Sequence, residues 1–156
     1  MFHVVEDTEC IRNLVEVIIQ RHGFETMSFS CSEEYIDFVN SPGYSRPVAV
    51  FTDVSMPGKN GYEMMSIVSR LKSGLKFVVM TGEPGIRSEY MNLACMYLGK
   101  PFTLANVAEV LSSIFRCHAF SPEEENGCCD SDSRKIFKLD NWSCPHRCSD
   151  CSSDGP

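Results

Sequence analysis

The sequence has little positive charge and no long apolar run. Lys and Arg number 14 against 21 Asp and Glu, so the formal net charge is −7. Non-specific nucleic-acid binding needs a basic surface, and this balance argues against one. No segment approaches the ~20 apolar residues of a membrane span, and Glu6 and Asp7 stand where a signal peptide would have its apolar core. We therefore expect a cytoplasmic protein with no membrane span and no direct nucleic-acid partner.

The chain has the composition of one globular domain followed by a different kind of segment. Its 156 residues, 43% apolar and 22% charged, can bury a substantial core but are short for two domains. From Cys117 onward aliphatic residues become rare, and eight acidic residues stand against four Lys and Arg. We expect a folded domain over 1–118 and an acidic, cysteine-rich tail over 119–156, either disordered or a small metal-binding segment.

Apolar runs of strand length alternate with segments whose apolar residues recur at helical spacing. Gly23 fits a helix stop, and Ser30 or Ser32 fits a helix N-cap. Strands are expected over 2–6, 25–29, 48–52, 76–80 and 96–99. Helices are expected over 8–21, 62–72, 86–95 and 103–116. One further helix is expected to begin after the Ser30 or Ser32 N-cap and to end at the Ser-Pro-Gly of 41–43. This alternation predicts an α/β protein with a doubly wound, five-stranded parallel sheet of order 2-1-3-4-5, the flavodoxin-like (βα)5 fold.

The same spacing assigns particular side chains to the core. His3 lies in a strand and is expected to have a structural role. Residues on apolar helix faces, expected to be buried, include Leu14, Leu71, Leu104 and Phe115. Three cysteines inside the expected elements are interpreted as small buried hydrophobes: Cys10, Cys31 and Cys95.

Polar side chains close four of the expected strands. Glu6 and Asp7 follow the first strand, and Asp53 ends the third, immediately before a strand-breaking Met-Pro-Gly run. Thr81 closes the fourth strand and Lys100 the fifth. The carboxyl ends of parallel strands meet at one edge of the sheet, which is where ligands bind in such folds. The sequence therefore predicts a single site rather than four unrelated features.

The chemistry of this cluster points to a metal ion and a phosphoryl group. Close carboxylates repel one another, and a divalent cation such as Mg²⁺ would offset that repulsion. The backbone carbonyl of Ser55 is a candidate further ligand, two residues after Asp53. Asp53 is a candidate nucleophile toward phosphorus, while Thr81 could donate a hydrogen bond to one phosphoryl oxygen and Lys100 could pair with another.

Taken together, these motifs resemble the receiver domain of two-component response regulators, over about residues 2–117. The matching features are an acid pair after strand one, Asp with Met-Pro after strand three, Thr-Gly after strand four and Lys-Pro-Phe after strand five. The resemblance implies that Asp53 accepts phosphate from a sensor histidine kinase or phosphotransfer protein. It also implies that Glu6, Asp7 and Asp53 bind Mg²⁺, and that Thr81 and Lys100 contact the phosphoryl group.

The resemblance assigns further roles near the site. Tyr97 occupies the family's aromatic switch position, whose ring turns inward when Thr81 moves toward phosphate. Ser55 and Glu83 stand where the family tunes dephosphorylation. The stretch from Thr81 to Lys100 is a few residues shorter than is typical of the family, and we expect the cut to fall in the fourth helix, part of the face that reports phosphorylation.

The cysteine-rich tail is open to two interpretations. Its Cys144, Cys148 and Cys151 have C-x3-C-x2-C spacing, with His146 between them. With His146 or an upstream cysteine, these thiols could form a small zinc site. The alternative is a disordered acidic tail, or the remnant of a lost output module.

Three functions are compatible with this pattern. The leading hypothesis is a stand-alone receiver that signals through phosphorylation-dependent contact with a downstream protein, with only slow self-catalysed phosphorylation and dephosphorylation. A second is a receiver scaffold whose tail binds zinc or senses redox state. A third is a phosphatase with an Asp nucleophile, but such enzymes commonly place an acid two residues further on, where this chain has Ser55.

Overall fold

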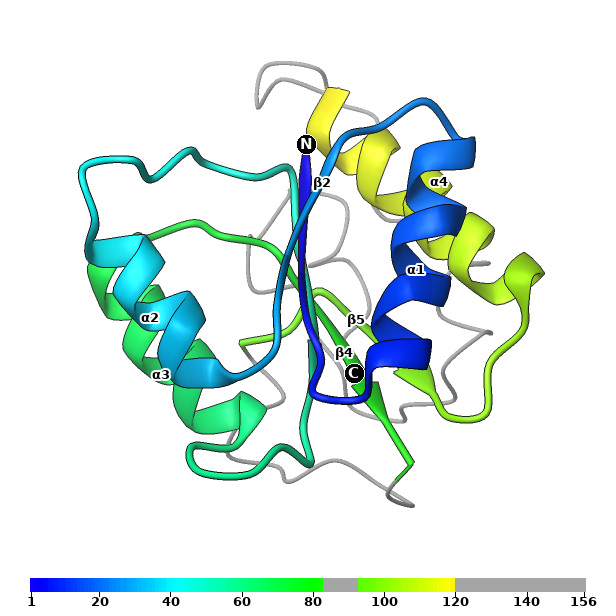
Figure 1. Ribbon diagram of the computed structural model, residues 1–156. Coiled ribbons are helices and arrows are strands. Elements are labelled where there is room, and N and C mark those ends of the chain that lie inside the picture. Colours follow the sequence, from blue (N-terminus) through cyan, green and yellow to red (C-terminus); the bar gives the residue numbers. More distant parts are fainter. Residues whose placement is uncertain (83–92, 120–156) are drawn as a thin grey trace, which may run out of the picture.

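The computed structural model describes residues 1–82 and 93–119, and strands and helices alternate through this part of the chain (Figure 1). The strands are β1 (Phe2–Val5), β2 (Thr26–Phe29), β3 (Val50–Asp53), β4 (Phe77–Thr81) and β5 (Met96–Gly99). The helices are α1 (Glu9–Arg21), α2 (Ser32–Asn40), α3 (Gly61–Leu71) and α4 (Leu104–Ala119). None of the helices in these two ranges is long and apolar enough to cross a membrane.

The five strands form one parallel sheet of order β2-β1-β3-β4-β5. The predicted doubly wound fold is therefore confirmed. β1 and β3 lie side by side at the centre, with His3 paired to Met27 on β2 and to Val50 on β3. Figure 1 shows α2 and α3 together on one side of the sheet and α1 and α4 on the other. The order places the carboxyl ends of β1 and β3 next to each other.

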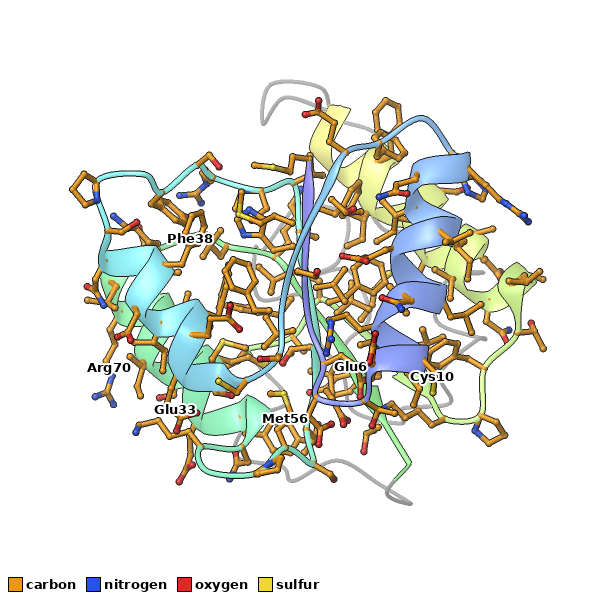
Figure 2. The ribbon with its side chains drawn as sticks, in the orientation of Figure 1. Glu6, Cys10, Glu33, Phe38, Met56 and Arg70 are labelled. Carbon is orange, nitrogen blue, oxygen red and sulfur yellow. The ribbon has the colours of Figure 1, made fainter. Side chains whose placement is uncertain are left out.

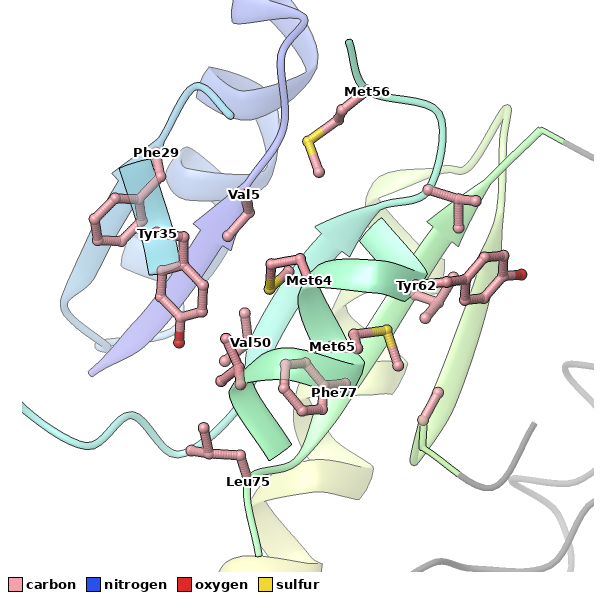
Figure 3. Close-up of a cluster of buried hydrophobic side chains, with 14 of the residues drawn as sticks. Val5, Phe29, Tyr35, Val50, Met56, Tyr62, Met64, Met65, Leu75 and Phe77 are labelled. Carbon is pink, nitrogen blue, oxygen red and sulfur yellow. The ribbon is translucent and has the colours of Figure 1, made fainter. Parts of the chain in front are cut away.

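Two apolar clusters hold the layers together, one on each face of the sheet. Strand side chains alternate between them, so Val5 and Val50 face α2 and α3, whereas Val4 and Phe51 face α1 and α4. Figure 3 shows the cluster on the α2–α3 side, where Met64 and Met65 reach down from α3 onto the strands. Because both faces are covered, β1, β3 and β4 are buried along their whole length.

Local sequence signals set several helix ends. Gly23 follows α1 with φ +84°, a conformation that glycine adopts at little cost. At the start of α3, the Asn60 side chain accepts the Glu63 N–H at 2.9 Å, and the Glu63 carboxylate accepts the Asn60 N–H at 3.1 Å. This reciprocal capping box satisfies two donors that the helix itself cannot.

The predicted N-cap of α2 is wrong. Cys31 is the capping residue, and Ser32 is the first residue of the helix, with its side chain buried. The N–H and hydroxyl of Ser30 instead donate to the Glu34 carboxylate, at 2.8 and 3.0 Å. The Ser30 hydroxyl is thus bonded to the Glu34 carboxylate and does not cap the helix.

Other residues expected in the core are exposed. Leu71 is the last residue of α3 and Leu104 the first residue of α4, and both are more than two-fifths exposed. Leu14 and Phe115 lie at the margin of their apolar faces and are also more than two-fifths exposed. Of the three cysteines expected to be buried, Cys10 is exposed, Cys31 is half-buried and Cys95 is buried.

The predicted helix over 86–95 falls mostly outside the described residues. Those that are described, 93–95, form a turn leading into β5. Ala94 and Cys95 are buried in this turn, and the Cys95 N–H donates to the Phe77 carbonyl at 2.8 Å. The entry into β5 is thus fixed directly against the start of β4.

Candidate functional site

Three carboxylates meet at the carboxyl edge of the sheet. Glu6 follows β1 directly, Asp7 begins the turn into α1, and Asp53 is the last residue of β3. Each offers an oxygen, and the three oxygens all lie within 4.8 Å of one another. Glu6 and Asp53 are buried and Asp7 is the most accessible of the three. Figure 2 shows Glu6 at this edge, at the end of β1.

Lys100, which directly follows β5, brings a positive charge into the same cluster. Its Nζ lies 2.8 Å from Glu6 Oε2 and 3.0 Å from Asp53 Oδ2. One ammonium therefore bridges carboxylates that are 47 residues apart in the sequence. Three carboxylates and one ammonium leave a formal excess of two negative charges, which favours a divalent cation at this edge.

The titration behaviour of these groups reflects their crowding. Burial raises the pKa of Glu6, the neighbouring Asp53 charge adds to this, and hydrogen bonds from Lys100 and the Thr8 N–H oppose it. Burial also acts against the charged form of Lys100, but hydrogen bonds to Glu6 and Asp53 outweigh that effect and raise the pKa of the ammonium. Lys100 therefore stays charged and holds both acids.

Asp53 is held at both carboxylate oxygens. Oδ1 accepts the Val54 N–H at 2.7 Å, and Oδ2 faces Lys100. The start of α3 packs on the same residue: the Gly61 N–H donates to the Val54 carbonyl at 3.1 Å, and a Cβ on Gly61 would lie only 1.9 Å from the Asp53 carbonyl oxygen. Only glycine permits this approach. Sequence reasoning missed this role of Gly61. The signal was the Asn-Gly pair at the start of the helix.

Arg12 is a second residue that sequence reasoning missed. From the first turns of α1, its Nη1 donates to the Glu6 carbonyl at 2.6 Å and reaches the Asp7 carbonyl at 3.4 Å. The guanidinium thus ties the backbone of the acid pair to the helix that follows it. Its signal was a basic residue on the helix directly after two acids.

Thr81 ends β4 at the carboxyl edge, Tyr97 lies within β5 opposite Val79, and Ser55 lies on the loop after Asp53. Thr81 is buried at the end of β4, and its carbonyl accepts the Lys100 N–H at 2.6 Å. Tyr97 is buried in the cluster on the α2–α3 side, and burial raises the pKa of its phenol. Ser55 is exposed, two residues beyond Asp53, and Glu83 lies outside the described residues.

The donor set fits a hard divalent cation. Glu6, Asp7 and Asp53 supply only oxygen ligands, and the Ser55 carbonyl lies on the adjoining loop. Mg²⁺ prefers such ligands and keeps part of its water shell. The candidate zinc ligands lie outside the described residues, so a zinc site there stays a prediction: Cys144, His146, Cys148 and Cys151.

Known proteins provide a direct comparison. A family model described as the response regulator receiver domain matches residues 2–112. Sporulation initiation phosphotransferase F of Bacillus subtilis is 23% identical over 111 residues, covering 69% of this chain and 87% of that protein. The transcriptional regulatory protein FixJ of Bradyrhizobium diazoefficiens is 26% identical over 117 residues, covering 73% of this chain and 56% of FixJ. The match thus spans most of one relative and about half of the other.

Solved structures show the same fold. The chemotaxis response regulator CheY4 of Vibrio cholerae superposes with a TM-score of 0.65 at 21% identity, covering 72% of this chain and 96% of that one. Full-length FixJ from B. japonicum superposes with a TM-score of 0.68 at 26% identity, covering 80% of this chain and 61% of that one. With a family match over more than half of its length, the chain belongs to the response regulator receiver domain family of two-component systems.

Proposed function

We propose that Asp53 accepts a phosphoryl group from the histidine of a sensor kinase or phosphotransfer protein, and that the modified domain signals by binding a downstream protein. The observation that carries this proposal is the Lys100 ammonium, which bridges Glu6 and Asp53 within a cluster of three carboxylates. A structural ion pair needs one acid. A site that stabilises a phosphoryl group needs several charges converging on one point.

Each residue of the cluster has a role in this transfer. A lone pair of an Asp53 carboxylate oxygen forms the O–P bond while the N–P bond of the donor breaks, and its electron pair stays on the imidazole nitrogen. Mg²⁺ bound by Glu6, Asp7, Asp53 and the Ser55 carbonyl would neutralise charge between the carboxylate and the phosphoryl oxygens. Lys100 is close enough to Asp53 to pair with the added group.

The response to phosphate is assigned to Thr81 and Tyr97. Thr81 ends β4 beside Gly99 of β5, at the same edge as Lys100, and its hydroxyl would donate to a phosphoryl oxygen. Tyr97 pairs with Val79 two residues before Thr81, with its ring inside the α2–α3 cluster. A shift at the end of β4 would therefore reach the phenol through adjacent strand positions.

The receiver is assigned to residues 1–118, and we propose that it acts as a switch for protein contacts rather than as an enzyme with turnover. The net charge of −7 suits a cytoplasmic protein partner better than direct contact with nucleic acid. Residues 119–156 are assigned to a separate acidic segment, as their composition indicates.

The test is covalent labelling. The protein is incubated with Mg²⁺ and a small acyl phosphate and its intact mass is measured, with Asp53→Asn as the variant and Asp37→Asn, an exposed aspartate on α2, as the matched control. One phosphoryl adduct is expected on the wild type and on Asp37→Asn, and none on Asp53→Asn. An adduct on Asp53→Asn would show that another residue is the acceptor.

A further inference from the structure

The loop between β3 and α3, residues 54–60, carries the Ser55 carbonyl and is fixed at its first residue, where Val54 is buried and its carbonyl accepts the Gly61 N–H at 3.1 Å. Met56 is buried in the α2–α3 cluster, and Asn60 caps α3. Between Ser55 and Lys59, the Lys59 N–H is the one backbone group for which the described residues provide a hydrogen bond to another element. Its acceptor is Glu33 Oε1 on α2, at 2.9 Å.

Two further contacts centre on the same carboxylate. Lys59 Nζ lies 3.7 Å from Glu33 Oε1. Gly58 has φ +78°, and a Cβ there would lie 2.9 Å from that oxygen, so the loop turns in a conformation that lets the carboxylate lie against its backbone. The hydrogen bond from the Lys59 N–H lowers the pKa of Glu33 and keeps its carboxylate charged. In Figure 2, Glu33 lies on the same side of the molecule as the loop of Met56.

We propose that Glu33 is a positioning residue for the phosphorylation site, which it serves by anchoring the 54–60 loop to the first turn of α2. The inference rests on the proposed function, because it assigns Glu33 the task of holding the Ser55 carbonyl in place for the cation. Mg²⁺ demands near-ideal octahedral geometry, so a ligand on a loosened loop loses affinity sharply. Glu33 itself touches neither the acids nor the transferred group.

The anchor is tested first without metal. Amide hydrogen exchange of Lys59 is measured by NMR in the wild type, Glu33→Ala, Glu33→Gln and Asp37→Ala, the last removing one exposed acid from the same helix. Glu33→Ala is expected to speed Lys59 exchange by about tenfold or more, because it removes the acceptor. Glu33→Gln keeps an acceptor oxygen and is expected to retain most of the protection. Equal exchange in the wild type and Glu33→Ala would overturn the proposal.

Mg²⁺ affinity then tests the consequence, by calorimetric titration beside the thermal midpoint of each variant. Glu33→Ala is expected to raise the Kd for Mg²⁺ about fivefold or more, with labelling at saturating Mg²⁺ within about twofold of wild type. Glu33→Gln is expected to restore the affinity, and Asp37→Ala to leave it unchanged. The proposal would be overturned if Asp37→Ala weakened Mg²⁺ binding as much as Glu33→Ala does. It would also be overturned if Glu33→Gln bound Mg²⁺ no more tightly than Glu33→Ala.

These outcomes separate the two proposals. Wild-type protein that binds Mg²⁺ and is labelled on Asp53, with Glu33→Ala indistinguishable from it, would contradict the role of Glu33 alone. Wild-type protein that neither binds Mg²⁺ nor accepts phosphate would contradict the proposed function and the positioning role with it, even where Lys59 exchange confirms the contact.

Discussion

The two faces of the sheet are packed with different chemistry. The cluster beneath α1 and α4 consists of aliphatic residues, Met80, Cys95 and two phenylalanines. The cluster beneath α2 and α3 includes three tyrosines, and the buried His3 ring faces the same side. His3 Nδ1 meets the Tyr35 hydroxyl at 3.2 Å, while its Nε2 has no hydrogen-bond partner among the described residues.

The two faces therefore differ in which conditions can perturb them. Apolar packing without polar atoms is insensitive to pH and has no alternative hydrogen bonds to adopt. Buried hydroxyls and an imidazole make the α2–α3 side dependent on protonation and on exact partners. The proposed switch residue Tyr97 and the Glu33 anchor both lie on this second side.

The largest expected effect comes from a substitution in the cluster beneath α1 and α4. Phe51→Ala removes a fully buried ring that packs on Phe2, and should lower the free energy of unfolding by about 3–5 kcal/mol. Urea denaturation measures the loss, and Phe115→Ala, at a half-exposed ring on α4, is the control and should lose less than half as much. Equal losses would contradict the expectation that burial of the ring sets the size of the effect.

A pH effect should distinguish the other face. Burial lowers the pKa of His3 from 6.5 to about 4, with the nearby chain terminus adding to the effect, so the unfolded chain takes up a proton at a higher pH than the folded protein. Stability is therefore complete above about pH 6.5 and falls as the pH drops toward 4, by about 2 kcal/mol from pH 7 to pH 5.

His3→Leu isolates this contribution. The variant keeps the volume of the side chain roughly constant but cannot bind a proton, so the difference in unfolding free energy between it and the wild type should change with pH by that amount. Phe51→Ala, on the other face, should show no such change in its difference from wild type. A pH-independent difference for His3→Leu would mean that the ring is protonated, or solvated, in the folded state.

The smallest expected effect concerns a buried hydroxyl on the α2–α3 side of the sheet. Ser32 Oγ is buried at the start of α2 and has no hydrogen-bond partner among the described residues. Ser32→Ala removes an unsatisfied hydroxyl and should stabilise the protein by up to ~1 kcal/mol, measured by urea denaturation. Destabilisation would indicate that a water or another group satisfies the hydroxyl.

The fold and the position of the site were accessible from the sequence for a simple reason. Apolar periodicity identifies strands and helices, and a polar residue at the end of an apolar run marks the carboxyl edge of a parallel sheet. The sequence placed Asp53 and Lys100 at this edge in this way, and in the structure the two side chains lie 3.0 Å apart, while their functional roles stay predictions. Periodicity does not say whether an apolar residue at a helix terminus will be covered, so Leu71 and Leu104 were wrongly placed in the core.

Contacts between distant residues were beyond the reach of the sequence pattern. The bridging of Glu6 and Asp53 by one ammonium depends on strand order and on the rotamer of Lys100 together. The Glu33–Lys59 contact joins residues 26 positions apart through a turn at Gly58. Such contacts are set by how the layers stack, and no local property of either residue indicates them.

The bond between the Lys100 amide and the Thr81 carbonyl has a consequence for the segment between β4 and β5. It closes the chain on itself at the edge of β4 and β5, so the spacing of these two residues is set by the sheet and is independent of the length of chain that connects them. A change in the length of the connecting segment therefore need not move Thr81 relative to Lys100 at the carboxyl edge of the sheet.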